Sequence, residues 1–187
     1  KSHIMQAVED SLQRLQIDNI DLYQTHWPDE DTIIDETLSA MDTLVQQGKV
    51  RYIGCSNYPA WQLIEALQTS EKNNLVQFDS LQPHYSLVNR SEYEDNLSTI
   101  CKKYKLGVIP YSPLGGGFLT GKYHTNKPLP KSVRANKTQK YMTDKNFLLV
   151  DLLESLAQTR NKSISQIALG WLSSQHEITA PIIGPTR

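Results

Sequence analysis

An α/β fold built on a parallel sheet is what the sequence predicts, and two observations predict it. Short apolar, β-prone runs alternate with amphipathic helical patterns along the chain, and five such runs can be found in its 187 residues. Each run also ends in polar residues before the next helix begins. In a parallel α/β barrel these strand ends share one face, and that face carries the chemistry.

The first half of the chain holds three of the expected strands, each followed by a helix. The strand that begins at Ile20 is stopped by Pro28, which cannot continue a central strand. Gly48 is expected to close the next helix, and Pro59 to open the one after it. The expected helices are 2–16, with Ile4, Val8, Leu12 and Leu15 on one face, 34–45 and a helix from residue 59 carrying Leu63, Ile64 and Leu67; the strands are 20–26, 50–55 and 75–81.

The second half continues the alternation, with one irregular stretch. Ser91–Glu94 and Ser163–Gln166 are capping boxes, which predict the start of a helix. A long polar segment, roughly 122–146, shows neither helical nor strand periodicity. The remaining expectations are strands at 107–110 and 180–183 and a helix marked by Leu149, Leu152, Leu153 and Leu156.

The fold class follows from what is missing as much as from what is present. An open doubly wound sheet would need a Gly-rich phosphate loop after its first strand, and no G-x-G-x-x-G occurs. Gly115–Gly117 comes late in the chain and has the wrong spacing. We therefore expect a (β/α)8 TIM barrel, of which this chain covers about the last five β/α units. Residues 1–187 would form a single, incomplete domain that lacks the first strands and the last helix.

Composition and charge narrow the function. The net charge of −1 gives no basic footprint for nucleic acid. Cys55 and Cys101 lie far apart without metal-ligand spacing, so we expect no metal site and a reducing, cytoplasmic compartment. No apolar run approaches the roughly 18 residues of a membrane span. The oligomeric state stays open.

Polar and special residues gather at the expected strand ends. Asn and Gln side chains suit a planar carboxamide, an exposed tyrosine suits a flat ring, and glycines let backbone N–H groups approach a pyrophosphate. Arginine beside threonine suits a phosphomonoester. Each group alone could equally be an ordinary cap, turn or solvated side chain, but five successive strand ends carry them: His26, Ser56, Asn57, Gln82, Tyr111, Ser112, Gly184, Thr186 and Arg187.

Several longer motifs resemble the aldo-keto reductase family. They run in the family's order over nearly the whole chain: LQIDNIDLYQTH at 15–26, GKVRYIGCSN at 48–57, YSPL at 111–114, GKY at 121–123 and PIIG at 181–184. Within the family, the chain is similar to the branch of bacterial general-stress reductases and potassium-channel β subunits. The resemblance implies an NADP(H)-dependent enzyme that reduces the carbonyl of a small-molecule substrate on a (β/α)8 barrel.

The resemblance also implies roles for single residues. His26 would be the active-site histidine that hydrogen-bonds the substrate carbonyl oxygen. The family's catalytic tyrosine, lysine and aspartate precede the region matched here, and Tyr23, Tyr85 and Tyr123 do not stand at the matching position. For the cofactor, the implied contacts are Ser56, Asn57 and Gln82 to the nicotinamide carboxamide, Tyr111 to its ring, Ser112, Leu114 and Gly116 along the pyrophosphate, Lys122 and Arg134 closing over it, and Gly184, Thr186 and Arg187 at the 2′-phosphate.

Three interpretations remain open from the sequence. The first is part of an NADPH-dependent reductase, with 122–146 as a lid over the cofactor. The second is a protein that binds NADP without turnover, either as a regulatory subunit or as an inactive fragment. The third is an unrelated phosphate-handling barrel that uses Arg187 and the last strand loops. A tyrosine and a lysine at the family positions would separate the first from the second.

Overall fold

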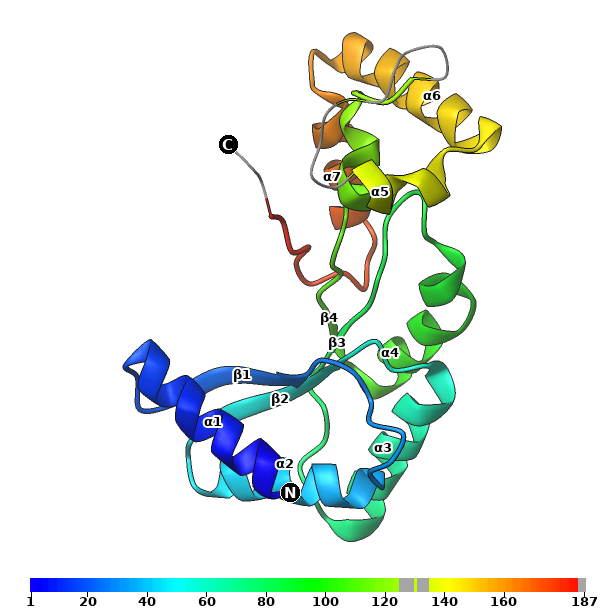
Figure 1. Cartoon of the computed structure of the whole chain (residues 1–187). Coiled ribbons are helices and arrows are strands. Elements are labelled where there is room, and N and C mark those ends of the chain that lie inside the picture. Colours follow the sequence, from blue (N-terminus) through cyan, green and yellow to red (C-terminus); the bar gives the residue numbers. More distant parts are fainter. Residues whose placement is uncertain (125–129, 131–134, 185–187) are drawn as a thin grey trace. The chain divides into compact units, whose positions relative to one another are not determined.

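The computed structural model describes residues 1–124, 130 and 135–184 of the chain. These residues form two compact units (Figure 1). The first unit is made of Lys1–Pro83 with Asn96–Gly107, and the second is made of His84–Asp95 with Val108–Arg187. Residue Arg134 and residues 185–187, which include Thr186 and Arg187, lie outside the described part.

A parallel sheet organises the first unit. β1 (Ile20–Thr25), β2 (Val50–Ser56) and β3 (Ser80–Gln82) lie side by side, and β4 (Gly107–Val108) completes the order β1-β2-β3-β4. Thr25, the last residue of β1, pairs with Cys55, so β1 and β2 end within one residue of each other. Strands that follow one another in both sequence and space are what successive β/α units produce. The predicted α/β class with a parallel sheet is confirmed.

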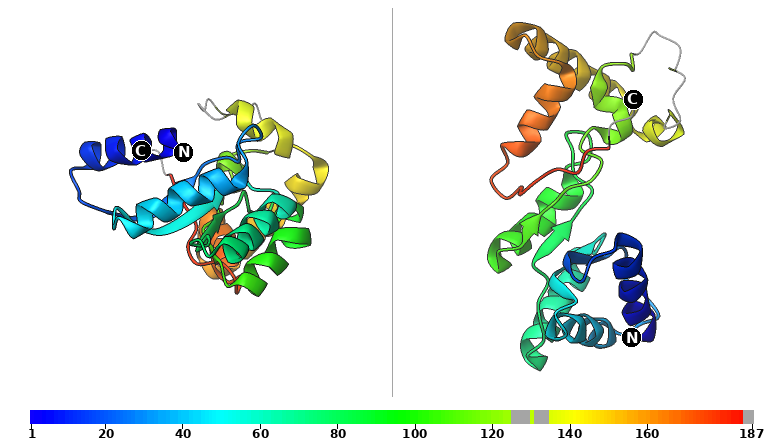
Figure 2. Two further views of the ribbon diagram at one scale, coloured as in Figure 1. Left: turned by 90° about the horizontal axis from the view of Figure 1, so that it is seen from below. Right: turned by 90° about the vertical axis from the view of Figure 1, so that its left-hand side faces the viewer.

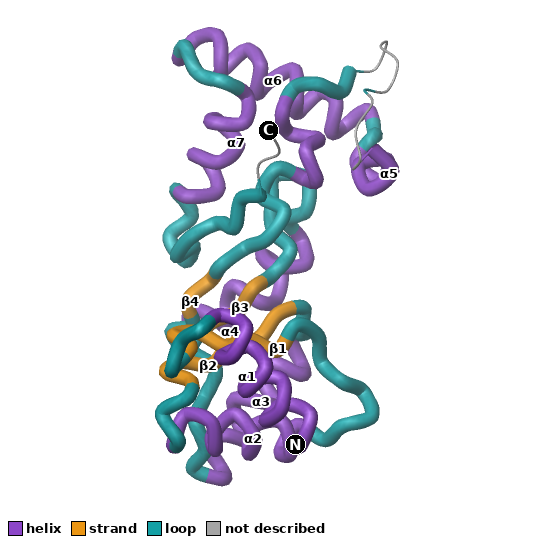
Figure 3. Tube along the Cα trace, turned by 60° about the vertical axis from the view of Figure 1, so that its left-hand side comes forward, coloured by secondary structure: helices purple, strands orange, loops and turns teal. Residues whose placement is uncertain are grey.

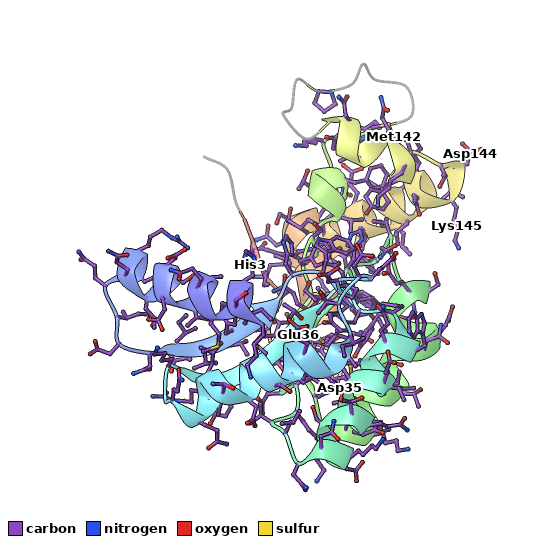
Figure 4. The ribbon with its side chains drawn as sticks, turned by 60° about the horizontal axis from the view of Figure 1, so that its bottom comes forward. His3, Asp35, Glu36, Met142, Asp144 and Lys145 are labelled. Carbon is purple, nitrogen blue, oxygen red and sulfur yellow. The ribbon has the colours of Figure 1, made fainter. Side chains whose placement is uncertain are left out.

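Helices cover this sheet and supply most of its core. They are α1 (Ser2–Leu15), α2 (Ile34–Gln46), α3 (Ala60–Asn73) and α4 (Ser98–Tyr104). Asp35 and Glu36 stand in the first turn of α2, where negative charge stabilises the helix (Figure 4). The fully buried side chains include Leu38, Leu44, Ile53, Leu63, Leu67 and Leu81. On α1, by contrast, only Val8 of the expected stripe is buried, and Leu15 is 61% exposed.

The strand expected at 75–81 is reduced to β3, which begins at Ser80 (Figure 3). At Val76, side chains make the main-chain hydrogen bonds that a neighbouring strand would otherwise make. Its N–H donates to Asp42 Oδ1 at 3.0 Å, and its carbonyl accepts from Ser70 Oγ at 2.9 Å. Since both backbone groups of Val76 are satisfied by the flanking helices, the chain has no need to pair there.

The helix expected to begin at Ser91–Glu94 is confirmed, but Ser91 is not its cap. Residues 91–104 are helical, with Tyr93–Leu97 in the wider π form. Ser91 already lies within the helix, and the N–H of Glu94 donates to Arg90 O at 2.9 Å. The Glu94 carboxylate also accepts charge-assisted hydrogen bonds from Tyr85 Oη at 2.6 Å and from Arg90 Nε at 2.9 Å.

The second unit is mainly helical. It contains η2 (Gly115–Thr120), α5 (Ala135–Thr138), η3 (Gln139–Tyr141), α6 (Asp144–Arg160) and α7 (Ile164–Ser173), and α6 and α7 pack against each other (Figure 2). The Ser163–Gln166 capping box is confirmed, with both reciprocal bonds present. The stripe expected on α6 is only partly correct, because Leu153 is buried and Leu152 is 57% exposed. The core cluster of this unit comprises Phe118, Leu119, Tyr123, Tyr141, Val150, Leu153 and Ala168.

Two expectations for the second unit need correction. Much of the segment 122–146 is helical where it is described, because α5, η3 and the start of α6 fall within it. The fifth strand, expected at 180–183, does not form among the described residues. Val108 instead makes a single parallel bridge to Ile178, and Ile182 N–H donates to Pro110 O at 2.9 Å. Pro181 has no N–H, so a regular ladder cannot be continued through it.

Candidate functional site

Three neighbouring strands of the first unit bring three of the predicted residues together. His26 follows the last residue of β1, Ser56 is the last residue of β2, and Gln82 is the last residue of β3. The register pairs Ser56 with Gln82, which places these two strand ends level. The sequence prediction that these side chains share one edge of the sheet agrees with this arrangement.

A line of hydrogen bonds joins these strand ends. Asn57 Nδ2 donates to the main-chain oxygen of His26 at 2.8 Å and to Ser56 Oγ at 3.1 Å. Ser56 Oγ in turn donates to the main-chain oxygen of Gln82 at 2.9 Å. Asn57 reaches both partners because its φ is +60°, a left-handed conformation that asparagine tolerates better than most residues.

Burial differs sharply along this line. Ser56 is only 1% exposed, so its hydroxyl acts as an internal connector between strands. Asn57 and Gln82 are half-buried, and His26 is exposed beside the ring of Trp27, with 6.1 Å between the ring centroids. The main chain of His26 is thus held by Asn57 while its imidazole faces solvent. An imidazole that is exposed on a fixed main chain is suited to hydrogen-bond a small substrate.

In the second unit the predicted pyrophosphate residues lie on a turn of unusual backbone. Three successive glycines have positive φ values: +57° at Gly115, +67° at Gly116 and +104° at Gly117. Ser112, just before them, also has a positive φ of +53°. Non-glycine residues in this region cost about 1–2 kcal/mol, and such strain gathers at ligand-binding turns.

Lys122 lies against the same turn. A Cβ atom added at Gly117 would stand in ordinary van der Waals contact with Lys122 Nζ, at 3.4 Å, so the ammonium lies close to the turn. The ammonium also lies 5.4 Å from the ring centroid of Tyr123. Leu114 supports the turn, because its main-chain oxygen accepts from the N–H groups of Gly117 and Leu119. Glycines with positive φ and a nearby ammonium fit an anionic group such as a pyrophosphate.

Tyr111 lies directly before this turn, and its ring has a partner that sequence reasoning missed. The imidazole of His84 stacks on it, with 4.9 Å between centroids and 11° between planes. Burial raises the pKa of Tyr111, and the charge of Glu92 raises it further. A signal for His84 was available, because it comes two residues after the strand-end Gln82.

The remaining expected residues contribute less. Gly184 is exposed, and Arg134, Thr186 and Arg187 lie outside the described residues. Within the described ranges, no group of three or more His, Cys, Asp or Glu side chains could hold a metal ion. A search of the described helices finds none that is long and apolar enough to cross a membrane.

Tyr23, Tyr85 and Tyr123 are all at least partly buried. Tyr85 is 1% exposed and donates to Glu94, which also raises its pKa, although burial is the larger cause. Tyr123 is also 1% exposed, and Tyr23 is half-buried with a pKa raised by burial. That none of the three replaces the family's catalytic tyrosine stays a prediction.

Several known proteins are similar to this chain. An uncharacterized oxidoreductase, YrpG, of Bacillus subtilis is 36% identical over 183 residues, which cover 97% of this chain and 54% of the relative. The L-glyceraldehyde 3-phosphate reductase of Escherichia coli K12 is 32% identical, with 100% of this chain and 56% of the relative covered. A probable voltage-gated potassium channel subunit beta of rice is 31% identical, with coverages of 100% and 58%.

A structural comparison agrees with the sequence comparisons. The glycerol dehydrogenase AKR11B4 of Gluconobacter oxydans superposes with a TM-score of 0.81 at 32% identity, covering 96% of this chain and 54% of that one. The chain therefore spans about half the length of the relatives it matches. The model of the Aldo/keto reductase family matches residues 1–187. The chain belongs to the aldo/keto reductase family.

Proposed function

We propose that the full-length protein is an NADP(H)-dependent oxidoreductase that reduces aldehyde or ketone carbonyls to alcohols. The observation that carries the proposal is the hydrogen-bonded line from His26 through Asn57 and Ser56 to Gln82, at three adjacent strand ends. The names of two relatives, a glyceraldehyde phosphate reductase and a glycerol dehydrogenase, support carbonyl and alcohol chemistry.

In this proposal His26 acts on the substrate. When bound, NADPH would supply the hydride to the carbonyl carbon and become NADP⁺, and a proton from a general acid or from water would complete the alcohol. Negative charge then develops on the carbonyl oxygen, and a donor aimed at that oxygen stabilises the transition state more than the ground state. The exposed imidazole of His26, on a main chain held by Asn57, is suited to be that donor.

The residues named in the sequence analysis would bind the cofactor. Gln82 can both donate and accept, as the nicotinamide carboxamide requires. Asn57 donates its two Nδ2 hydrogens to His26 O and Ser56 Oγ, so it would contact the carboxamide through Oδ1. Ser56 Oγ links the two residues, because it accepts from Asn57 and donates to Gln82 O. Tyr111 would stack on the nicotinamide ring. Ser112, Leu114, Gly116 and Lys122 would hold the pyrophosphate, with Arg134 closing over it. Gly184, Thr186 and Arg187 would hold the 2′-phosphate.

One observation favours a second candidate function. The rice relative named as a potassium channel subunit beta matches the whole of this chain at 31% identity. Under this alternative the full-length protein binds NADP(H) as a regulatory subunit and has no useful turnover. Both candidates need the same cofactor residues, so only turnover separates them.

A cytoplasmic location is also part of the proposal. Cys55 and Cys101 are both buried, and neither is part of a disulfide. Burial raises the pKa of the Cys55 thiol far above its ordinary value, and Cys101 adds to this, so the Cys55 thiol is poorly reactive. Two buried cysteines that form no disulfide suit a reducing compartment.

Assaying the full-length protein tests the proposed function. NADPH oxidation would be followed by absorbance with a panel of small aldehydes and ketones, beside a fluorescence titration of NADPH. Saturable NADPH binding with carbonyl-dependent oxidation supports the reductase. Binding without oxidation of NADPH by any carbonyl supports the regulatory subunit. Absence of NADPH binding overturns both.

A further inference from the structure

His84 occupies a position between two tyrosines in the second unit. Its ring is nearly parallel to that of Tyr111, and the two main chains form a parallel bridge at the same residues. Its Nε2 lies 3.1 Å from Tyr141 Oη. The imidazole is therefore fixed from one side by a stacked ring and along its edge by a hydroxyl.

Tyr141, the partner at the edge of the His84 ring, is held in the core. Tyr141 is 5% exposed and belongs to the core cluster, where its ring lies 6.1 Å from that of Phe118. The main chain of His84 is held as well, since its oxygen accepts from Asn89 Nδ2 at 2.9 Å. A ring anchored at both its main chain and its edge cannot tilt without disturbing the core.

The electrostatic surroundings favour a neutral His84 ring. Burial lowers its pKa, the charge of Lys140 lowers it further, and the charge of Glu92 opposes both. Tyr141 and Tyr111 are the other titratable groups against the ring. A neutral imidazole can share one hydrogen bond with the Tyr141 hydroxyl and still lie flat on Tyr111.

Tyr141 also contacts the Gly-rich turn. A Cβ atom added at Gly115 would stand 3.6 Å from Tyr141 Cε2, and one added at Gly116 would stand 3.5 Å from Thr138 Cγ2. The segment from Thr138 to Tyr141 thus packs against both the turn and His84. Through His84, the same segment is linked to the Tyr111 ring.

We propose that His84 is a positioning residue, which sets the plane of the Tyr111 ring so that it can stack on the nicotinamide of NADP(H). This inference rests on the proposed function, because it concerns the same cofactor. It adds a residue that does not itself touch the cofactor and acts only through Tyr111. A simple packing role for His84 would affect all ligands of the second unit equally.

The test uses cofactor fragments and three variants of the full-length protein. NADPH contains the nicotinamide, whereas 2′,5′-ADP contains only the adenosine end. His84→Ala removes the stacked ring, His84→Phe keeps a flat ring without nitrogen atoms, and Tyr141→Phe removes only the hydroxyl. Affinities would be measured by calorimetry, and circular dichroism would confirm that each variant is folded.

We expect His84→Ala to weaken NADPH binding about two- to tenfold, the range expected for one lost aromatic pair, and to leave 2′,5′-ADP binding unchanged. His84→Phe should restore most of the NADPH affinity, and Tyr141→Phe should have an intermediate effect. Unchanged NADPH affinity in His84→Ala overturns the inference, and so does an equal loss for both ligands or a failure of His84→Phe to restore it. If the unaltered protein binds no NADPH, the proposed function itself fails, and the inference fails with it.

Discussion

The candidate residues of the two units are held in place by different means. In the first unit, His26, Ser56 and Gln82 sit at the ends of regular parallel strands and are joined by hydrogen bonds. In the second unit, Tyr111 and the glycines at 115–117 sit on irregular backbone, held by aromatic side chains from distant parts of the chain. Register fixes the first set, and packing fixes the second.

This difference predicts different consequences for substitution. A strand-end side chain can be removed without moving its neighbours, because the backbone ladder still holds the strand in register. A glycine of the Gly-rich turn cannot be replaced without such movement, because the turn fits its neighbours only in one backbone conformation. Changes at the strand ends should therefore alter chemistry or local stability selectively, and changes at the glycines of the turn should destabilise the second unit.

The largest effect is expected for His26→Ala in the full-length protein. The imidazole is exposed, so its loss should leave the fold and the NADPH affinity nearly unchanged. Turnover should fall by about 10²–10³, as for the loss of one donor to a developing oxyanion. Steady-state kinetics and NADPH titration of the same preparation would measure both. Collapse of NADPH affinity with unchanged turnover at saturation would show that His26 serves the cofactor or the fold instead.

The next effect is expected for Gly115→Ala in the turn. Its φ is +57°, and the added methyl group would lie 2.8 Å from Val88 Cγ2. Left-handed strain costs about 1–2 kcal/mol and overpacking about 1–3 kcal/mol, so the free energy of unfolding should fall by about 2 kcal/mol or more. Chemical denaturation would measure it.

A matched control for this prediction is Gly170→Ala on α7. No atom lies within 4 Å of a Cβ placed there, and the residue is helical. This change should stabilise the protein by about 0.5–1 kcal/mol. Equal effects of the two substitutions would show that the turn does not depend on its left-handed backbone.

A smaller effect is expected for Ser56→Ala. Its buried hydroxyl donates to Gln82 O, so its loss leaves that oxygen short of a donor and should cost about 1 kcal/mol of unfolding free energy. Ser174→Ala is the control, because the exposed Ser174 Oγ also donates to a main-chain oxygen, that of Trp171. It should change stability by less than about 0.5 kcal/mol. Equal losses of unfolding free energy in the two variants would mean that burial does not strengthen the contribution of the Ser56 hydrogen bond to stability.

The smallest effect concerns pH and the second unit. The pKa of His84 is lowered by burial from its ordinary value of 6.5. The unfolded chain therefore binds the proton more readily, and stability should fall as the pH drops below about 6.5 and level off below the folded-state pKa. Denaturation curves at several pH values would show this decline. His84→Phe should flatten it, and an unchanged decline in that variant would assign it to other groups.

Much of the first unit could be predicted from the sequence. The polar residues that follow β1, β2 and β3 were visible because each apolar run ends at a breaker or an amide, as at Pro28 and Asn57. Parallel strands that share one edge then bring such residues together without further information. The shortening of β3 was not visible, because it depends on Asp42 and Ser70 bonding to Val76 from other elements.

Less of the second unit could be predicted. The Ser163–Gln166 capping box was found because it is a local pattern. His84 stacks on Tyr111, which is 27 positions away in the sequence, and forms a hydrogen bond with Tyr141, which is 57 positions away. No local sequence pattern predicts such pairs. The same holds for the final segment, whose Ile178 bridges Val108 without forming a strand.

The central claim is that this chain carries the residues that bind NADP(H), and a paired titration tests it most directly. NADPH and NADH would be titrated by calorimetry into the full-length protein and into its Arg187→Ala variant. One charge-assisted bond to the 2′-phosphate is worth about 1.5–3 kcal/mol, reduced by salt, so the variant should bind NADPH about tenfold or more weakly and NADH almost unchanged. Absence of NADPH binding by the unaltered protein, or equal losses for the two dinucleotides in the variant, would contradict this account.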